Sequence, residues 1–273
     1  MINFSNISSS SSSVSLNLAP PSLYERVSSV YQRKIQKFVE ILQENKWFKT
    51  SMVLGTLLSE PLSSIKAGFY YPLGQKKAFN FYNLNPKSII KEQVDKRPIL
   101  LIHGNYHNQS AWIDLAKRMN YLNPNSLGPI YTVNLPNGSI TDKDYEIIHE
   151  KFLEIEAQYE KHGKNDVKID LIGHSRGGVL AQTIVFWLYS KNSYQKIGKI
   201  INIGNVLNQK DINDRKEFDP DFVSYTYEIT GEYDVLVRKS SLLSSDHQRK
   251  IPSGHLGLLY SDQVHQQIID WLR

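Results

Sequence analysis

The pattern of apolar and polar residues divides the chain into three parts. Residues 1–22 are rich in Ser and Asn and end near a Pro-Pro pair, a composition typical of a disordered tail. Within residues 23–65, apolar side chains recur at spacings of three and four residues, and a second apolar stretch occupies 47–58. This periodicity predicts an N-terminal helical extension. Residues 66–273 have a different pattern and are predicted to form the main domain.

In the main domain, short apolar runs alternate with longer amphipathic segments. Short apolar runs indicate strands buried on both faces, and the segments between them indicate crossover helices. We therefore predict an α/β fold with a mostly parallel central sheet covered by helices on both faces. The predicted strands are 67–71, 78–82, 98–102, 130–134, 167–172, 199–203, 224–230 and 248–251, the first two forming an antiparallel hairpin at one edge. The predicted helices are 110–120, 142–161, 176–190 and 261–272.

Composition and charge narrow the class of protein. Of the 273 residues 40% are hydrophobic and 22% are charged, as in ordinary soluble globular proteins. The net charge of +5 comes from scattered Lys and Arg residues, so nucleic-acid binding is not expected. The absence of Cys excludes disulfides, thiol catalysis and Cys-based metal sites. No apolar run approaches the roughly 18 residues that span a bilayer, and the N-terminus does not resemble a secretory signal peptide. We expect a cytoplasmic protein, or one exported without a classical signal peptide.

One motif carries most of the chemical information. A strand candidate ends in a Gly-x-Ser-x-Gly pentapeptide, and a helix candidate follows directly. A serine at such a turn is held in a strained backbone conformation that exposes its hydroxyl at the carboxyl end of the strand. The two glycines are needed because side chains there would collide with the neighbouring strand and helix. The pattern predicts that Ser175 is a nucleophile, in the sequence Gly173-His174-Ser175-Arg176-Gly177.

Two further polar residues follow later strand candidates. Asp234 lies in a turn after one strand, where a carboxylate can orient an imidazole. His255 lies in the loop between the last strand and the terminal helix. The order Ser175, Asp234, His255 is the chain order of a catalytic triad on a strand-turn-helix serine. Glu232 and Asp246 are the alternative acids.

Two backbone N–H groups are candidates for binding an oxyanion. The buried strand 98–102 runs into His103-Gly104, and the N–H of Asn105 follows, with that of Tyr106 as second choice. The other donor is the N–H of Arg176, at the positive end of the helix after Ser175.

The region 66–273 resembles the α/β-hydrolase superfamily, and within it looks most like lipases and esterases. The resemblance rests on His103-Gly104, on the pentapeptide with Gly178, on residues 231–237 and on Gly254-His255. It implies a serine hydrolase that cleaves carboxylic esters through an acyl-enzyme, with no metal or organic cofactor. Acyltransferases and thioesterases share these motifs and stay open, as does a non-catalytic binding protein on the same scaffold.

The substrate side is less determined. We expect an acyl ester or lipid as substrate, and peripheral membrane contact through the N-terminal helix is an alternative to simple packing of that helix. The short polar link between 204 and 222 predicts a small flap rather than a cap domain. A zinc site at His103 and His107 is not expected, because Gly104 disfavours a helix there and no Glu follows His103. His103 is expected to shape the loop, and His174, which precedes Ser175, is expected to be structural. The Arg176 side chain is expected to form an exposed salt bridge.

Overall fold

A computed structural model describes residues 48–75, 81–122, 126–190, 197–207, 209–216, 219–234, 236–237 and 241–273. The chain separates into two units, Met1–Met52 and Val53–Arg273, and the following account concerns the second unit. The predicted tail at 1–22 and the part of the predicted helical extension up to residue 47 lie outside the described residues.

Within the described residues, the core of the fold is a six-stranded sheet in which every neighbouring pair of strands is parallel. The strand order β2-β1-β3-β4-β5-β6 changes direction between β1 and β3. Ligands of open parallel sheets bind at the carboxyl ends of the strands beside such a reversal. The strands are β1 (Ile99–Ile102), β2 (Ile130–Thr132), β3 (Ile169–His174), β4 (Ile197–Ile203), β5 (Thr226–Gly231) and β6 (Gln248–Ile251).

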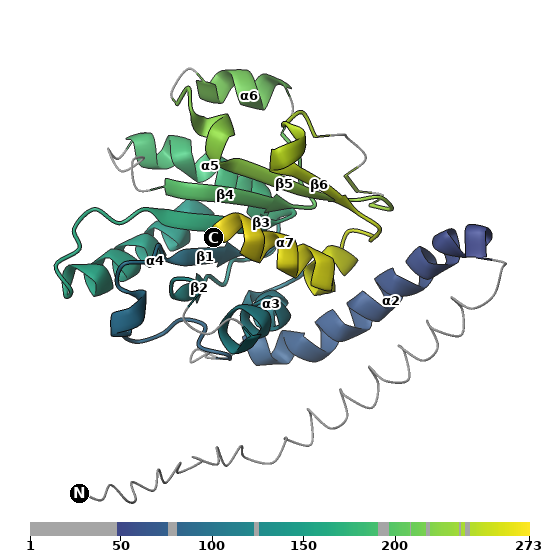
Figure 1. Cartoon of the computed structure of the whole chain (residues 1–273), viewed down its shortest axis with the longest axis horizontal. Helices are drawn as coiled ribbons and strands as arrows, with labels where there is room; N and C mark the ends of the chain where they lie inside the picture. The colour runs from purple at the N-terminus through teal and green to yellow at the C-terminus, as the bar shows by residue number, and fades with distance from the viewer. Residues whose placement is uncertain are drawn as a thin grey trace, which may run out of the picture. The chain divides into compact units, whose positions relative to one another are not determined.

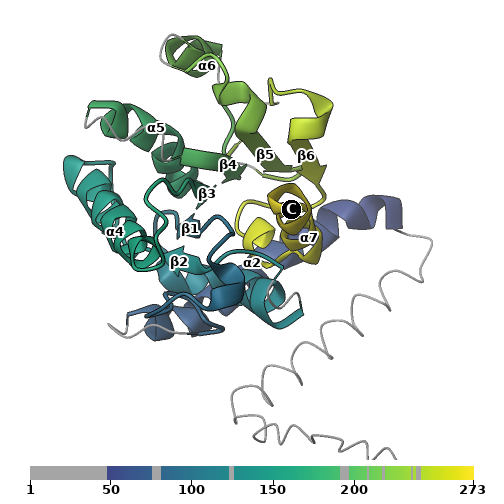
Figure 2. The same ribbon diagram turned by 60° about the vertical axis from the view of Figure 1, so that its left-hand side comes forward.

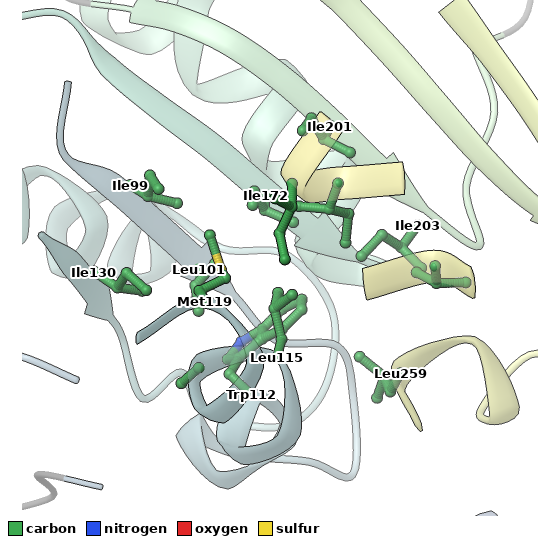
Figure 3. Packing of buried hydrophobic residues seen from close by; sticks show 14 of the residues in the cluster. Ile99, Leu101, Trp112, Leu115, Met119, Ile130, Ile172, Ile201, Ile203 and Leu259 are labelled. Atoms are coloured by element: carbon green, nitrogen blue, oxygen red, sulfur yellow. The ribbon is translucent and has the colours of Figure 1, made fainter. Parts of the chain in front are cut away.

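Helices cover both faces of this sheet, which confirms the predicted fold class (Figures 1 and 2). Neighbouring strand residues point to opposite faces, so Leu100 and Leu171 pack with α4 and α5, whereas Leu101 and Ile172 pack with α3 and α7. Figure 3 shows the buried cluster that contains Leu101 and Ile172, of which Trp112 is also a member. The helices on the two faces are α4 (Asp142–Glu160), α5 (Arg176–Ser190), α3 (Ile113–Lys117) and α7 (Asp262–Leu272).

Shorter helical turns complete the domain. The link after β4 contains α6, and the predicted helix 110–120 is built from three successive turns of different pitch. The additional segments are α6 (Gln209–Lys216), the 3-10 turns η1 (Lys91–Gln93), η2 (Gln109–Trp112), η5 (Phe222–Tyr225), η6 (Ser245–His247) and η7 (Gly257–Tyr260), and the π-helical turn η3 (Arg118–Leu122).

The prediction of a strand at 67–71 is wrong, because these residues belong to the helix α2 (Phe48–Gly74). Tyr70 is buried while its neighbour Phe69 is 69% exposed, and Tyr70 is fixed by a hydrogen bond to Asp114. A five-residue apolar run is compatible with a strand or a helix, and its sequence alone does not distinguish the two. The partner strand predicted at 78–82 lies largely outside the described residues, and Phe81 and Tyr82 are not in a strand.

The predicted boundary between residues 65 and 66 falls inside α2. The C-terminal half of this helix is attached to the domain by polar contacts. Lys66 forms an ion pair with Asp114, and the side chains of Asn108 and Gln109 donate hydrogen bonds to the last carbonyls of the helix at 2.8 Å each. None of the helices in the described parts of the chain combines the length and apolarity needed to cross a membrane.

Candidate active site

Ser175 occupies the sharp turn between β3 and α5. Its φ angle is +54°, a left-handed conformation that is strained for a residue with a side chain. Its N–H donates to the carbonyl of Ile203 at 2.8 Å, which ties the turn to the end of β4. A Cβ at Gly173 would lie 2.3 Å from the carbonyl oxygen of Gly177, and one at Gly177 would lie 2.0 Å from that of Ile102. Both glycines of the motif are therefore required by close backbone approaches.

Asp234 and His255 are in direct contact. His255 Nδ1 lies 2.7 Å from Asp234 Oδ2, and the other carboxylate oxygen accepts the N–H groups of Leu236 and Val237 at 2.9 Å each. Burial by itself would raise the pKa of Asp234, but the hydrogen bond and charge of His255 and the two N–H groups outweigh it and lower that pKa. Asp234 is therefore an ionised acceptor that fixes the tautomer of His255. Glu232 and Asp246 are exposed.

The His255 ring lies at the same strand ends as Ser175. A Cβ at Gly204 would be 3.1 Å from two atoms of this ring, so the ring packs on the backbone just beyond β4. Gly204 follows Ile203, the residue whose carbonyl binds the Ser175 N–H. The structure thus places the three predicted residues around the carboxyl ends of β3, β4 and β5.

His174 contacts the loop that carries His255. Its Nε2 lies 3.0 Å from the carbonyl oxygen of His255, and the two rings lie 4.8 Å apart. Because a carbonyl only accepts, the Nε2 must carry the hydrogen. Burial lowers the pKa of His174 to about 3, so this ring is neutral. The sequence indicated a structural role for His174, and the structure identifies the contact with the His255 backbone.

The two predicted oxyanion donors belong to Arg176, directly after Ser175, and to Asn105, in the loop after β1. A Cβ at Gly104 would lie 3.0 Å from Ser175 Cβ, so the loop after β1 passes directly over the serine. The Tyr106 N–H already donates to Asn137 Oδ1 at 2.7 Å. No acceptor within the described residues engages the N–H of Asn105 or Arg176. Asn105 is therefore the better candidate of the two loop residues.

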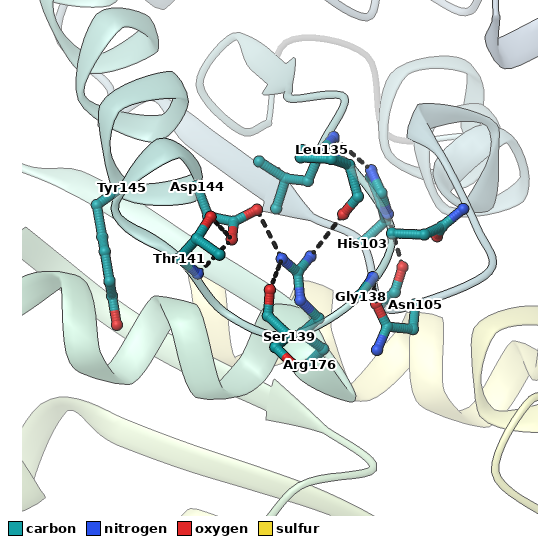
Figure 4. Close-up of polar contacts among 12 residues, drawn as sticks. His103, Asn105, Leu135, Gly138, Ser139, Thr141, Asp144, Tyr145 and Arg176 are labelled. Carbon is teal, nitrogen blue, oxygen red and sulfur yellow. Dashed lines mark hydrogen bonds and ion pairs between the residues drawn. The ribbon is translucent and has the colours of Figure 1, made fainter.

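The Arg176 side chain is buried, which corrects the expectation of an exposed salt bridge. Its guanidinium forms an ion pair with Asp144, with Nη2 and Oδ1 2.6 Å apart and the side chains 7% and 1% exposed (Figure 4). It also donates to the carbonyls of Pro136 and Ser139 at 3.1 and 3.3 Å. The sequence around Arg176 does not indicate this ion pair, because Asp144 lies 32 residues upstream, at the start of α4.

His103 and His107 are separately engaged. His103 accepts the Leu135 N–H at 2.8 Å and lies 2.8 Å from the Gly104 carbonyl, while His107 Nε2 lies 3.1 Å from the Tyr260 hydroxyl. Burial lowers the pKa of each to about 4. No group of three or more metal-ligating side chains occurs in the parts of the chain that the structure describes.

The parallel sheet and the strained serine at the end of β3 define the α/β-hydrolase fold. Residues 93–242, more than half of the chain, match the family of the PGAP1-like alpha/beta domain. The chain therefore belongs to this family. The matched segment contains Ser175 and Asp234 but ends before His255. No curated protein sequence is significantly similar to this chain.

Solved structures with a related arrangement are distant in sequence. A gene product of Listeria innocua is 14% identical over 66% of this chain and 94% of its own, with a TM-score of 0.41. The RedJ thioesterase of the prodiginine pathway of Streptomyces coelicolor is 10% identical over 63% and 83%, with a TM-score of 0.38. A serine hydrolase of carbazole degradation is 13% identical over 64% and 90%, with a TM-score of 0.41.

Proposed function

We propose that the protein is a serine hydrolase that cleaves carboxylic esters through Ser175, His255 and Asp234. The observation that carries this proposal is a serine at positive φ whose turn is bound to the end of β4, where the ring of a histidine fixed by a buried aspartate also packs. A serine that only capped helix α5 would need neither the strained backbone nor a paired histidine at the adjacent strand ends.

The proposed reaction begins with attack of the Ser175 Oγ on an acyl carbonyl while His255 Nε2 takes the hydroxyl proton. Asp234 stabilises the resulting imidazolium through Nδ1. The negative charge on the carbonyl oxygen is stabilised by the N–H groups of Asn105 and Arg176. His255 then returns the proton to the leaving alcohol, and water releases the acyl group from Ser175 by the same steps.

Exposed apolar side chains near these residues favour an apolar acyl group. Tyr106, next to Asn105, is 86% exposed, and Leu236, two residues after Asp234, is 72% exposed. Large exposed apolar side chains close to a candidate site suit contact with an aliphatic chain. We therefore propose acyl esters of increasing chain length, including lipid esters, as the substrates to test first.

The test is labelling with a fluorophosphonate, measured by intact mass. A single adduct on the wild-type protein is expected, and it should be lost in Ser175→Ala and retained in the control Ser245→Ala, which replaces an exposed serine. For ester hydrolysis, Ser175→Ala or His255→Ala should lower kcat by about 10⁶ and Asp234→Asn by about 10⁴. An adduct that persists in Ser175→Ala would refute the assignment of the nucleophile.

A second measurement separates hydrolysis from acyl transfer. The products of an activated ester are compared with and without an added alcohol. Release of free acid in both conditions supports a hydrolase, whereas dominant formation of the new ester identifies an acyltransferase on the same residues. A folded protein that is neither labelled nor active would favour a binding role for the scaffold.

A further inference from the structure

The helix α2 contacts the loop that carries His255 through one carboxylate. Glu60 Oε2 accepts the N–H of Leu256 at 3.1 Å, and Oε1 accepts the N–H of Gly257 at 2.8 Å. These are the first two backbone donors after His255. They lie at the start of the 3-10 turn η7, where the first N–H groups have no partner within the turn itself. The carboxylate therefore fixes the backbone directly after the histidine.

The residues around His255 are shaped to accept this carboxylate. A Cβ at Gly254 would lie 2.4 Å from Glu60 Oε1, and a Cβ at Gly257 would lie 3.1 Å from the same atom. A side chain at position 254 would therefore displace the Glu60 carboxylate from this place. The motif Gly254-His255 was read from the sequence as part of a hydrolase pattern, and the structure adds a packing reason for its glycine.

The backbone of the loop that carries His255 is thus bound by two side chains. His174 Nε2–H donates to the carbonyl of His255, and Glu60 accepts from the next two N–H groups. The ring itself contacts Asp234. Because the ring direction follows from the backbone position, loss of the Glu60 contact would remove one of the restraints on the ring and leave those of Asp234 and His174 in place. A misplacement of about 1 Å in a catalytic group can lower the rate about 100-fold.

We propose that Glu60 is a positioning residue for His255, and that α2 is a working part of the active site although it precedes the segment that matches the family. The inference rests on the proposed function of His255 as the general base. It predicts that the carboxylate acts on turnover rather than on substrate binding, because Glu60 contacts the backbone that follows His255.

The central variant is Glu60→Gln, which keeps the shape but offers one acceptor oxygen and one NH₂ group to two N–H donors. Its kcat for ester hydrolysis should fall about 10- to 100-fold with little change in KM, and labelling of Ser175 should slow in proportion. Glu60→Asp retains the charge and should restore part of the rate. The matched control is Tyr70→Phe, which removes the hydrogen bond of α2 to Asp114 and keeps the ring that packs against Tyr260 of η7.

Two further measurements do not depend on catalysis. Hydrogen exchange of the Leu256 and Gly257 amides should be at least tenfold faster in Glu60→Gln than in Tyr70→Phe. The low-field proton resonance of His255 Nδ1, hydrogen-bonded to Asp234, should broaden or shift in Glu60→Gln alone. If wild-type Ser175 is not labelled, the proposed function fails, and this resonance still reports on whether Glu60 positions the ring.

The results that overturn the inference are distinct from that failure. Unchanged amide exchange in Glu60→Gln would show that the carboxylate does not hold the loop. Faster exchange with an unchanged resonance and a kcat equal to that of Tyr70→Phe would show that the loop is held but that the ring does not depend on it.

Discussion

The buried ion pair between Arg176 and Asp144 allows a sharp test of how the serine turn is stabilised. The perturbation is Asp144→Asn, which keeps the side-chain shape and removes the charge. In the wild-type structure Asp144 Oδ2 accepts the N–H and the hydroxyl of Thr141 at 2.8 and 3.1 Å, forming the capping box of α4. Its Oδ1 faces the guanidinium of Arg176, the residue directly after Ser175 (Figure 4).

The magnitude follows from what the substitution leaves behind. Removing one partner of a buried ion pair costs about 3–5 kcal/mol, because the remaining charge stays buried without compensation. The guanidinium would keep only two carbonyl partners, and its Nε already has none within the described residues. In Asp144→Asn the amide oxygen can still accept hydrogen bonds from Thr141, so a change in the helix cap adds little to the loss of stability. Because domains are stable by about 5–15 kcal/mol, the loss is a large fraction of the total.

The assay is urea unfolding of four proteins at neutral pH. Asp144→Asn should lose about 3–5 kcal/mol of unfolding free energy, whereas Arg176→Met should lose less, since Asp144 keeps its Thr141 contacts. The double variant should recover most of the loss, because no buried charge is left unpaired. Asp142→Asn, an exposed residue in the same helical turn, is the control and should change stability by less than about 1 kcal/mol.

Either of two results would refute this reasoning. The first is a loss in Asp144→Asn no larger than that in Asp142→Asn, which would mean that water or relaxation compensates the guanidinium. The second is a double variant as unstable as Asp144→Asn, which would mean that the cost arises from the α4 cap and not from the unpaired charge.

Two predictions concern the pH dependence of stability. Burial lowers the pKa of His103 and His107 to about 4 and that of His174 to about 3. As pH falls below 6.5, the unfolded chain therefore binds protons before the folded chain does. The free energy of unfolding should fall by about 2 kcal/mol per histidine between pH 7 and pH 5. Urea unfolding at pH 7 and 5 tests this, and equal stabilities would contradict it. Burial raises the pKa of Glu228, so the folded state holds its proton longer and stability should decline as pH rises above the usual Glu range. Glu228→Gln should therefore be at least as stable as the wild type at pH 8, and a lower melting temperature there would show that the ionised form is compensated.

Much of the fold was predictable because its strands are buried on both faces. Leu100 and Leu101 point to opposite helical layers, so the apolar run carries no alternation and indicates a central parallel strand. The turn at Ser175 was predictable for a different reason. Backbone contacts at Gly173 and Gly177 exclude every side chain, and such a constraint leaves a direct mark on the sequence.

The features that escaped prediction depend on contacts between distant segments. The run at 67–71 is the C-terminal part of helix α2, and its Tyr70 binds Asp114, 44 residues away. Arg176 became buried because Asp144 lies at the start of α4. In each case the local sequence is compatible with more than one structure. The distant partners, Asp114 and Asp144, belong to no recognisable sequence motif, so the contacts could not be predicted.

The same dependence on distant partners explains how the candidate site is divided along the chain. The family-matched segment 93–242 supplies Ser175 and Asp234, each placed by a strand that ends in a tight turn. His255 lies after that segment, in a loop between an edge strand and α7, where the sheet gives it less support. A loop in that position needs external contacts to stay in register with Ser175. His174 contacts it from the serine turn, and Glu60 contacts it from α2. If both contacts are required, residues on both sides of the matched segment are needed to complete the candidate site. A protein cut back to 93–242 would lack His255, the proposed general base, and should show no ester hydrolysis.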